Sequence, residues 1–195
     1  MNISKLRSTL SLLAVLGTGS AFVLTAPTPV QAKTKTKMVG GAAMYPTKNI
    51  VENAVNSKDH TTLVAAVQAA GLTDTLSGPG PFTVFAPTNE AFNKLPAGTV
   101  DTLLKPENKG TLTSVLTYHV IAGKYSAKDL KKLVKQGGGI AHLKTVEGDL
   151  LTFSKDGKGV KVTDTKGNVS HITIADVNQS NGVIHVVDTV LMPAS

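Results

Sequence analysis

Residues 83–92, with the sequence TVFAPTNEAF, decide most of what can be inferred about the fold. Together with Phe82, their apolar first half is typical of a short strand that is buried on both faces. Pro87 ends this strand, because proline lacks the N–H group that a central strand needs. Thr88 can cap a short helix that carries Phe92. The segment therefore predicts a buried strand that leads directly into a helix.

Helical patterns lie on both sides of this segment. Before it, apolar residues recur at helical spacing in 49–57 and again in 61–70, where Gly71 is placed to end the helix. After it, an apolar stripe predicts a further helix over 112–120. A capping-box-like SAKD sequence then opens another helix over 126–136, which three glycines end.

The hydrophobic period changes to two after Gly139, which indicates strands. The candidate strands are residues 143–147, 150–154, 160–163, 170–174 and 184–191. Asp156-Gly157 and Asn181-Gly182 are strong turn signals between them. Helices first and antiparallel strands second predict an α+β domain, in which helices cover part of a β-sheet core.

The composition excludes several classes of protein. The 195 residues are 41% hydrophobic, which is enough for one domain with a core. The chain has no cysteine, so a disulfide scaffold, a cysteine zinc site and a thiol nucleophile are excluded. It has no tryptophan, and its one arginine is Arg7, so bidentate phosphate contacts and stacking platforms are scarce. We therefore expect no nucleic-acid partner.

The N-terminal residues have the order of a secretory signal peptide. Lys5 and Arg7 precede an apolar run over 10–24, and small residues near Ala32 suit a cleavage site. An uncleaved anchor is the alternative, but the run is shorter than the roughly 20 residues that a membrane span needs. We expect residues 1–32 to be removed, with no transmembrane segment in the mature chain. The protein is then secreted or periplasmic, and associated with the cell surface.

Residues 33–44 are rich in lysine and glycine and are expected to form a flexible tail before one domain over 45–195. The formal charge is +7, and removal of the leader with Lys5 and Arg7 lowers it to +5. Three of these charges lie in the tail, on Lys33, Lys35 and Lys37, so the folded part is near +2. We expect weak, salt-dependent contact of the tail with anionic surfaces, and no strongly electrostatic interface on the domain.

Catalytic motifs are absent from the sequence. It contains no Gly-x-Ser-x-Gly elbow, no phosphate-binding loop and no His-Glu-x-x-His helix. The five histidines are isolated in sequence, so a metal site needs them to converge in space. They are His60, His119, His142, His171 and His185. Apolar neighbours around Tyr118-His119 favour a partly buried, hydrogen-bonded histidine over a catalytic one.

Four stretches together resemble the fasciclin domain family, and in particular its bacterial secreted single-domain members. They are residues 83–92, the Tyr118-His119 pair within LTYHVIAG, residues 181–191 (NGVIHVVDTVL) and the helical opening 49–71. The match covers about 45–193 in one register. The resemblance implies a wedge-shaped β-sandwich with helices packed on one side. It also implies no enzymatic activity, no cofactor or metal, and adhesion to cells or matrix through protein surfaces.

The resemblance implies roles for particular residues as well. Tyr118 and His119 match a motif implicated in adhesion. Asp176-Val177 resembles an Asp-Ile pair proposed to contact integrins, with valine in place of isoleucine. Stabilisation of the fold is the alternative role for Tyr118, His119 and Asp176. The motif residues expected to be structural are Thr83, Phe85, Pro87, Thr88, Phe92, Asn181, Gly182, His185 and Asp188.

Three functions of different classes follow. The first is a non-enzymatic adhesion module at the cell surface, in a biofilm or in an extracellular matrix, with a protein or a polysaccharide as partner. The second is an extracytoplasmic carrier of a small apolar ligand, or an envelope stress protein. The third, a hydrolase, depends on convergence of the histidines. A filled core favours adhesion, whereas an apolar cavity of about 300 Å³ or more favours a carrier.

Overall fold

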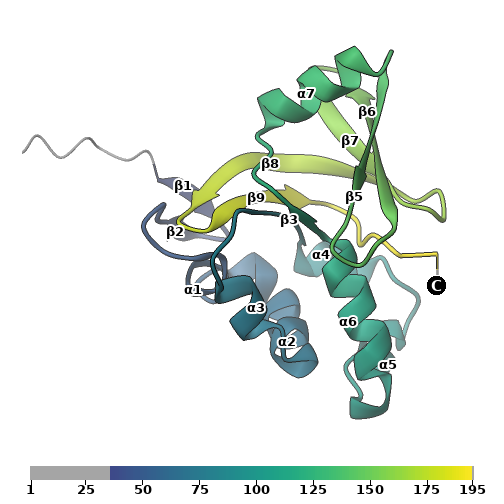
Figure 1. The fold of residues 1–195 in the computed structure, drawn as a ribbon. Coiled ribbons are helices and arrows are strands. Elements are labelled where there is room, and N and C mark those ends of the chain that lie inside the picture. Colours follow the sequence, from purple (N-terminus) through teal and green to yellow (C-terminus); the bar gives the residue numbers. More distant parts are fainter. Residues whose placement is uncertain (1–35, 195) are drawn as a thin grey trace, which may run out of the picture. The chain divides into compact units, whose positions relative to one another are not determined.

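A mixed seven-stranded sheet forms the frame of residues 36–194, the part of the chain that the computed structural model describes (Figure 1). Its strands are β3 (Phe82–Pro87), β4 (Val120–Ala122), β5 (Ile140–Lys144), β6 (Leu150–Asp156), β7 (Gly159–Thr163), β8 (Val169–Gln179) and β9 (Gly182–Val187). They are arranged in the order β4-β3-β9-β8-β7-β6-β5, with β3 parallel to β9 and the other neighbours antiparallel. The expected signal peptide, residues 1–32, lies outside the described residues, as do Lys33 and Lys35.

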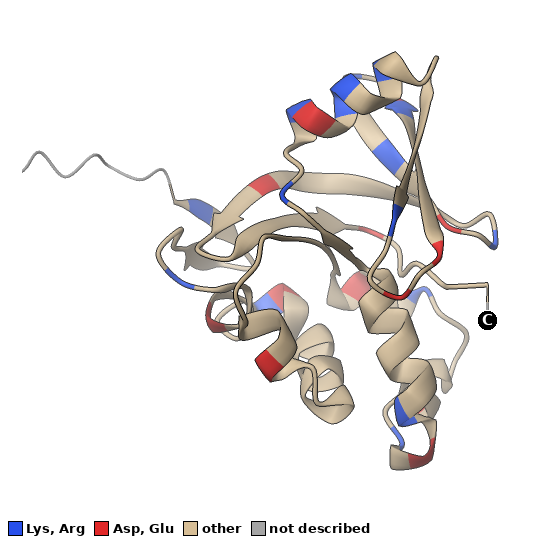
Figure 2. Ribbon diagram, viewed as in Figure 1, with Lys and Arg blue, Asp and Glu red and all other residues tan. Residues whose placement is uncertain are grey.

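Helices cover this sheet mainly from one side. They are α1 (Ile50–Ala54), α2 (Thr61–Ala70), α3 (Thr73–Ser77), α4 (Asn89–Asn93), α5 (Thr99–Leu103), α6 (Lys109–Tyr118) and α7 (Ala127–Gln136), with 3₁₀ turns η1 (Lys58–His60) and η2 (Pro106–Asn108). Helices α1 to α6 lie below β3 and β9 in Figure 1, whereas α7 packs against β5, β6 and β7 on the other side. Lysines recur along α7 and on the strands beside it (Figure 2).

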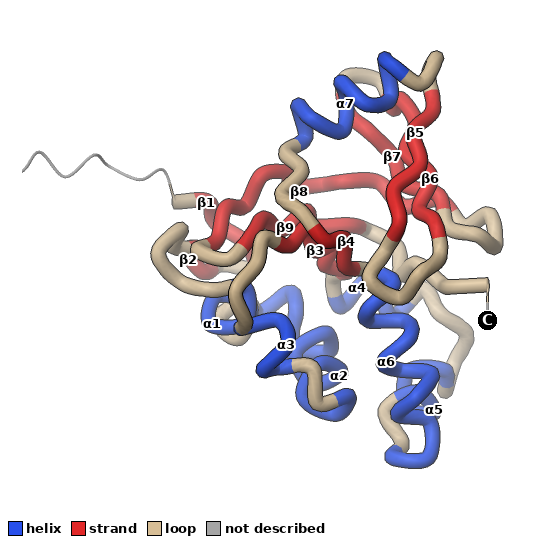
Figure 3. The backbone as a smooth tube through the Cα atoms, viewed as in Figure 1, coloured by secondary structure: helices blue, strands red, loops and turns tan. Residues whose placement is uncertain are grey.

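A bend in β8 divides the sheet into two layers (Figure 3). The register of β8 against β9 shifts between Ile172 and Ile174, and again between Ile174 and Val177. Such bulges increase the local twist and redirect a strand. Asp176 lies in the second bulge with a φ of 56°. One layer contains β4, β3 and β9, the other contains β5, β6 and β7, and β8 joins them. The predicted α+β sandwich with helices mainly on one side is therefore confirmed.

Alternate side chains of β3 enter two different cores. Val84 and Ala86 belong to the apolar cluster that the sheet forms with α1 to α6. Phe85 belongs to a second cluster, between the two layers and α7, where its ring centroid is 5.5 Å from that of Phe153. Successive side chains of a strand point to opposite faces, so both faces of β3 are buried. The prediction of a strand with two buried faces is confirmed.

From residue 37 onward, the segment expected to be a flexible tail forms a β-hairpin instead. Strands β1 (Lys37–Val39) and β2 (Ala42–Met44) form a hairpin around two glycines of positive φ. Val39 and Met44 are buried in the helix-side core, and Lys37 Nζ donates a hydrogen bond to Ala175 O. Burial of two apolar side chains, worth roughly 1.5–3 kcal/mol each, holds a segment whose composition alone predicts disorder.

Other element boundaries also differ from the predictions. Helix α6 ends at Tyr118, and Val120 lies on strand β4 instead of continuing the helical stripe. Strand β5 begins at Ile140, and Thr145 instead stabilises the turn that follows, by donating from Oγ1 to Asp149 O at 2.9 Å. Within residues 36–194, no helix is long and apolar enough to cross a membrane.

Candidate interaction site

Tyr118 is fully buried at the end of α6, and its hydroxyl joins three parts of the fold. The hydroxyl donates a hydrogen bond to Leu150 O at 2.9 Å and accepts one from the Thr165 N–H at 3.1 Å. Burial of the ring raises the pKa of Tyr118, because the phenolate loses its hydration. Tyr118 therefore connects α6 to β6 and to the loop between β7 and β8.

His119 connects α6 to the C-terminal segment, and only 2% of its surface is exposed. The Leu191 N–H can only donate, so Nε2 of His119 accepts this bond at 3.0 Å. Nδ1 then carries the proton and donates to Val115 O at 2.7 Å. Burial lowers the pKa of His119 to about 4, so the ring is neutral at pH 7.

Asp176 and the buried His185 form a second junction, at the bulge of β8. Oδ1 of Asp176 accepts the Ala127 N–H at 2.7 Å and so stabilises the first residue of α7. The Asp176 N–H donates to Nδ1 of His185 at 3.3 Å, and Nε2 of His185 donates to Tyr125 O at 2.8 Å. Burial lowers the pKa of His185. The ring of Phe85 stacks on this imidazole at a centroid distance of 5.5 Å.

Val177, next to Asp176, is 1% exposed and belongs to the helix-side core. Three of the four residues expected to contact a partner, namely Tyr118, His119 and Val177, thus have no exposed surface to offer. Their place in the interior follows from the bonds and packing described above. Asp176 alone of the four is partly exposed.

Asn181 and Gly182 hold the start of β9 against the helices. Oδ1 of Asn181 accepts the Ile50 N–H at 3.1 Å, and Nδ2 donates to Leu76 O at 2.8 Å and to Gly78 O at 3.0 Å. One side chain therefore joins α1, the end of α3 and the β8–β9 turn. A Cβ atom at Gly182 would lie 2.1 Å from Phe82 O, so only glycine fits there.

The remaining motif residues also make internal contacts. Thr83 Oγ1 donates to Gly123 O at 2.7 Å, and Thr88 Oγ1 accepts the Ala91 N–H at the start of α4. Pro87 and Phe92 are buried. Asp188 accepts the His171 N–H at 2.8 Å. Partial burial acts to raise the pKa of Asp188, but the hydrogen bonds from the His171 N–H and the Thr189 hydroxyl, with the positive charge of Lys94, outweigh it and lower that pKa.

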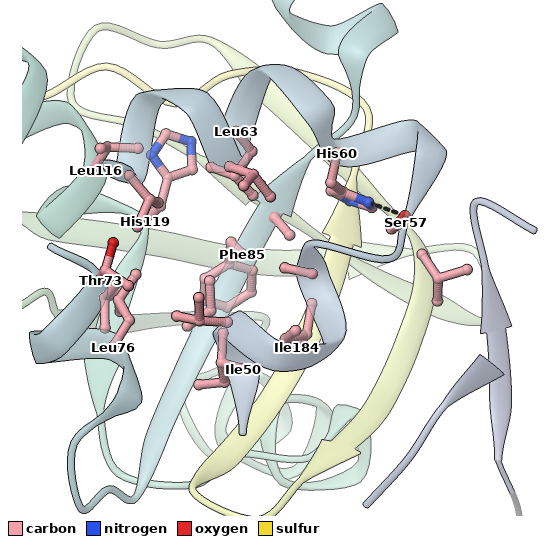
Figure 4. Close-up of a pocket in the computed structure, with 18 of the residues that line it drawn as sticks. Ile50, Ser57, His60, Leu63, Thr73, Leu76, Phe85, Leu116, His119 and Ile184 are labelled. Atoms are coloured by element: carbon pink, nitrogen blue, oxygen red, sulfur yellow. Dashed lines mark hydrogen bonds between the residues drawn. The ribbon is translucent and has the colours of Figure 1, made fainter. Parts of the chain in front are cut away.

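A small apolar cavity lies between the helices and β3 (Figure 4). Its volume is about 50 Å³, and Ile50, Leu63 and Ile184 are among the side chains that line it. His60 also lines it: Nδ1 of His60 is 2.8 Å from Ser57 Oγ, and burial lowers the pKa of the ring. This volume is far below the roughly 300 Å³ of a small-molecule pocket.

The histidines do not gather at one place in the fold. His60 and His119 line the cavity, His185 lies beside Tyr125, and His142 and His171 are exposed on β5 and β8. Within residues 36–194, no group of three or more histidine or acidic side chains could hold a metal ion.

A second, open cleft lies between α7 and the hairpin of β6 and β7, with a volume of about 480 Å³. It is lined by Lys131, Val134, Lys135, Gly139, Lys155, Gly157, Lys158, Gly159 and Val160. This concentration of lysines is not evident from the sequence, because the two walls are about twenty residues apart along the chain. The available signal was the helical spacing of the lysines in 128–135.

Comparison with known proteins agrees with this architecture. The family model of the Fasciclin domain matches residues 58–193. Protein sll1483 of Synechocystis is 48% identical, over 89% of this chain and 92% of that protein. Immunogenic protein MPB70 of Mycobacterium bovis is 38% identical, over 72% of this chain and 66% of that protein.

An animal relative and a solved structure extend the comparison. Transforming growth factor-beta-induced protein ig-h3 of Sus scrofa is 42% identical, over 67% of this chain and 17% of that protein. The FAS1 domain pair of the insect cell adhesion molecule Fasciclin I superposes with a TM-score of 0.66. That match covers 74% of this chain and 51% of the solved one, at 19% identity. The chain described here belongs to the fasciclin domain family.

Proposed function

We propose that the protein is a secreted or periplasmic adhesion module, associated with the cell surface, that acts through its folded surface and not through catalysis. One observation carries this proposal. The polar side chains of the family motifs, such as Tyr118, His119 and Asn181, use their hydrogen-bonding groups inside the domain. They build a rigid scaffold, and the exterior of that scaffold is left for interaction.

Two further points support this function. The leader-like order of residues 1–32 supports export. The similar solved structure comes from a protein named as a cell adhesion molecule, which is in agreement with such a role. The alternative, a carrier of a small apolar ligand, gains no support from a cavity of about 50 Å³.

Attachment of coated beads tests the proposal. Beads carrying the chain from Lys33 onward, at a series of surface densities, are offered to a biofilm of the producing cells. Once one copy on a bead has bound, the other copies bind at a high effective concentration, as in an intramolecular reaction. The number of attached beads should therefore rise more steeply than in proportion to the surface density of the protein. Beads coated with the heat-unfolded chain serve as the control.

A deletion of residues 33–36 distinguishes the tail from the folded domain. If attachment persists at all but the lowest salt concentrations, the domain surface is the adhesive part. If the deletion abolishes attachment at every salt concentration, or if native and unfolded chains attach equally, the proposal is wrong.

A further inference from the structure

We propose, building on the adhesion function above, that the cleft between α7 and the β6–β7 hairpin binds a linear acidic polysaccharide. Lys131 and Lys135 form one wall of this cleft, and Lys155 and Lys158 form the other. Figure 2 shows lysines on α7 and on the strands that face it. The inferred partner is a chain of sugars that carries regularly spaced carboxylate or sulfate groups.

The two walls are held in place by core packing. Lys131 and Lys135 are four residues apart on α7, so their side chains lie on one face of the helix, about one turn apart. Lys155 lies near the end of β6, and Lys158 lies in the turn that leads to β7. Between the walls, Val134 of α7 and Val160 of β7 are buried in the same cluster. The positions from which the lysines extend are therefore fixed before any ligand binds.

The positive charge of the cleft is not neutralised within the domain. Among the described residues, no carboxylate oxygen lies within 4.0 Å of any of these four ammonium groups. The two acidic residues of the same segments form no ion pair with these four lysines. Asp129 accepts a hydrogen bond from Ser126 Oγ at 2.6 Å, and Asp156 lies 3.7 Å from Nε2 of His171. A polyanion supplies the missing counter-charge.

The charge is also concentrated at this site. The two segments that border the cleft, 127–136 and 155–161, contain seven lysines and two aspartates. The rest of residues 36–194 contains nine lysines and eleven acidic residues. The cleft therefore carries a net positive charge on a domain whose remaining surface is slightly negative, and it directs an anionic partner to this one region.

The form of the cleft favours a sugar chain over the other polyanions. Its lysines stand on two walls around a recess, which admits a strand-like ligand but not the flat surface of a bilayer. No aromatic residue and no arginine lines it, so bases would find no stacking partner, and a sugar chain would be held through its charged groups and not by stacking. Gly139, Gly157 and Gly159 border it without side chains, which lets a bulky sugar ring approach the backbone.

Two variants with equal charge loss test the site. The cleft variant is K131Q/K135Q/K155Q/K158Q, and the control K58Q/K105Q/K109Q/K166Q removes four exposed lysines elsewhere. Calorimetry with a polygalacturonate oligomer should give about tenfold weaker binding for the cleft variant and at most about a twofold change for the control. Dextran, vesicles with anionic phospholipid and a thymidine oligonucleotide are measured beside it. Thermal melts of both variants should match that of the unmodified chain.

Several results would overturn the inference. They are no polygalacturonate binding by the unmodified chain, equal weakening in both variants, or tighter binding of the vesicles or the oligonucleotide with the same dependence on the cleft. The adhesion function and the polysaccharide site can be refuted independently of each other. Beads that do not attach although polygalacturonate binds overturn the adhesion function. Beads that attach while the cleft variant binds polygalacturonate normally overturn the site.

Discussion

Replacement of His119 by alanine should destabilise the domain by about 2–4 kcal/mol at pH 7.5. The substitution leaves the buried Leu191 N–H without an acceptor, which costs about 1–3 kcal/mol. It also leaves a cavity where a fully enclosed ring was packed, which adds to that cost. Urea unfolding followed by circular dichroism measures this change in the free energy of unfolding.

The pH dependence of this difference makes the prediction specific. The pKa of His119 is about 4 in the folded chain and 6.5 when the ring is exposed. As the pH falls, His119 of the unfolded chain is therefore protonated before His119 of the folded chain. The contribution of the neutral His119 to stability is complete above pH 6.5 and is lost as the pH falls toward 4. Between pH 7.5 and pH 5, the unmodified protein should lose about 2 kcal/mol through this residue, and the alanine variant should not.

The difference in the free energy of unfolding between the unmodified protein and the alanine variant should therefore be about 2 kcal/mol smaller at pH 5 than at pH 7.5. His142→Ala is the matched control, because His142 is exposed on β5, and it should change stability by less than about 0.5 kcal/mol at both pH values. An unaltered melt for His119→Ala, or a gap that is the same at both pH values, would refute the structural role of this histidine.

Three further predictions concern other parts of the chain. Tyr118→Phe should lower stability by about 1–2 kcal/mol, because the Thr165 N–H loses its acceptor; a denaturation midpoint equal to that of the unmodified chain would contradict this. Asn181→Ala should cost about 2–4 kcal/mol, since three backbone groups lose their partner, whereas Asn93→Ala on the exposed side of α4 should be nearly neutral in the same assay. N-terminal sequencing of the exported protein should begin at Lys33, and an intact Met1 on a membrane-bound form would exclude cleavage.

The segment around β3 and α4 could be predicted because its signals are local. Pro87 ends the strand and Thr88 caps the helix whatever the rest of the chain does. The β1–β2 hairpin could not be predicted, because its strands of three residues are stabilised only by the burial of Val39 and Met44 in the core. The sequence predicts a helix at Val120, because an apolar residue four positions after Leu116 fits the helical period, and only pairing with β3 makes this residue part of a strand.

The surface of the domain was predicted less well than its interior. A net charge near +2 on the folded part predicts no strongly electrostatic interface. This prediction fails at the cleft, because a net charge does not show where the charged side chains cluster. Lys131 and Lys155 come together only because α7 packs across β6 and β7. The two shifts of register in β8, the second of which contains Asp176, likewise depend on pairing with β9. The hydrophobic pattern of the sequence gives no sign of them.

The parallel pairing of β3 with β9 also has a consequence for the order of events during folding. Phe82 pairs with Gly182, and Pro87 pairs with Val187, so this strand must wait for a partner that is made a hundred residues later. Contacts of such long sequence separation slow folding. Among the helices that precede β9, four have only five residues each and are too short to be stable alone, namely α1, α3, α4 and α5. The layer of β4, β3 and β9 on which they pack is complete only when β9 pairs with β3, so a chain truncated before Gly182 should lack this fold.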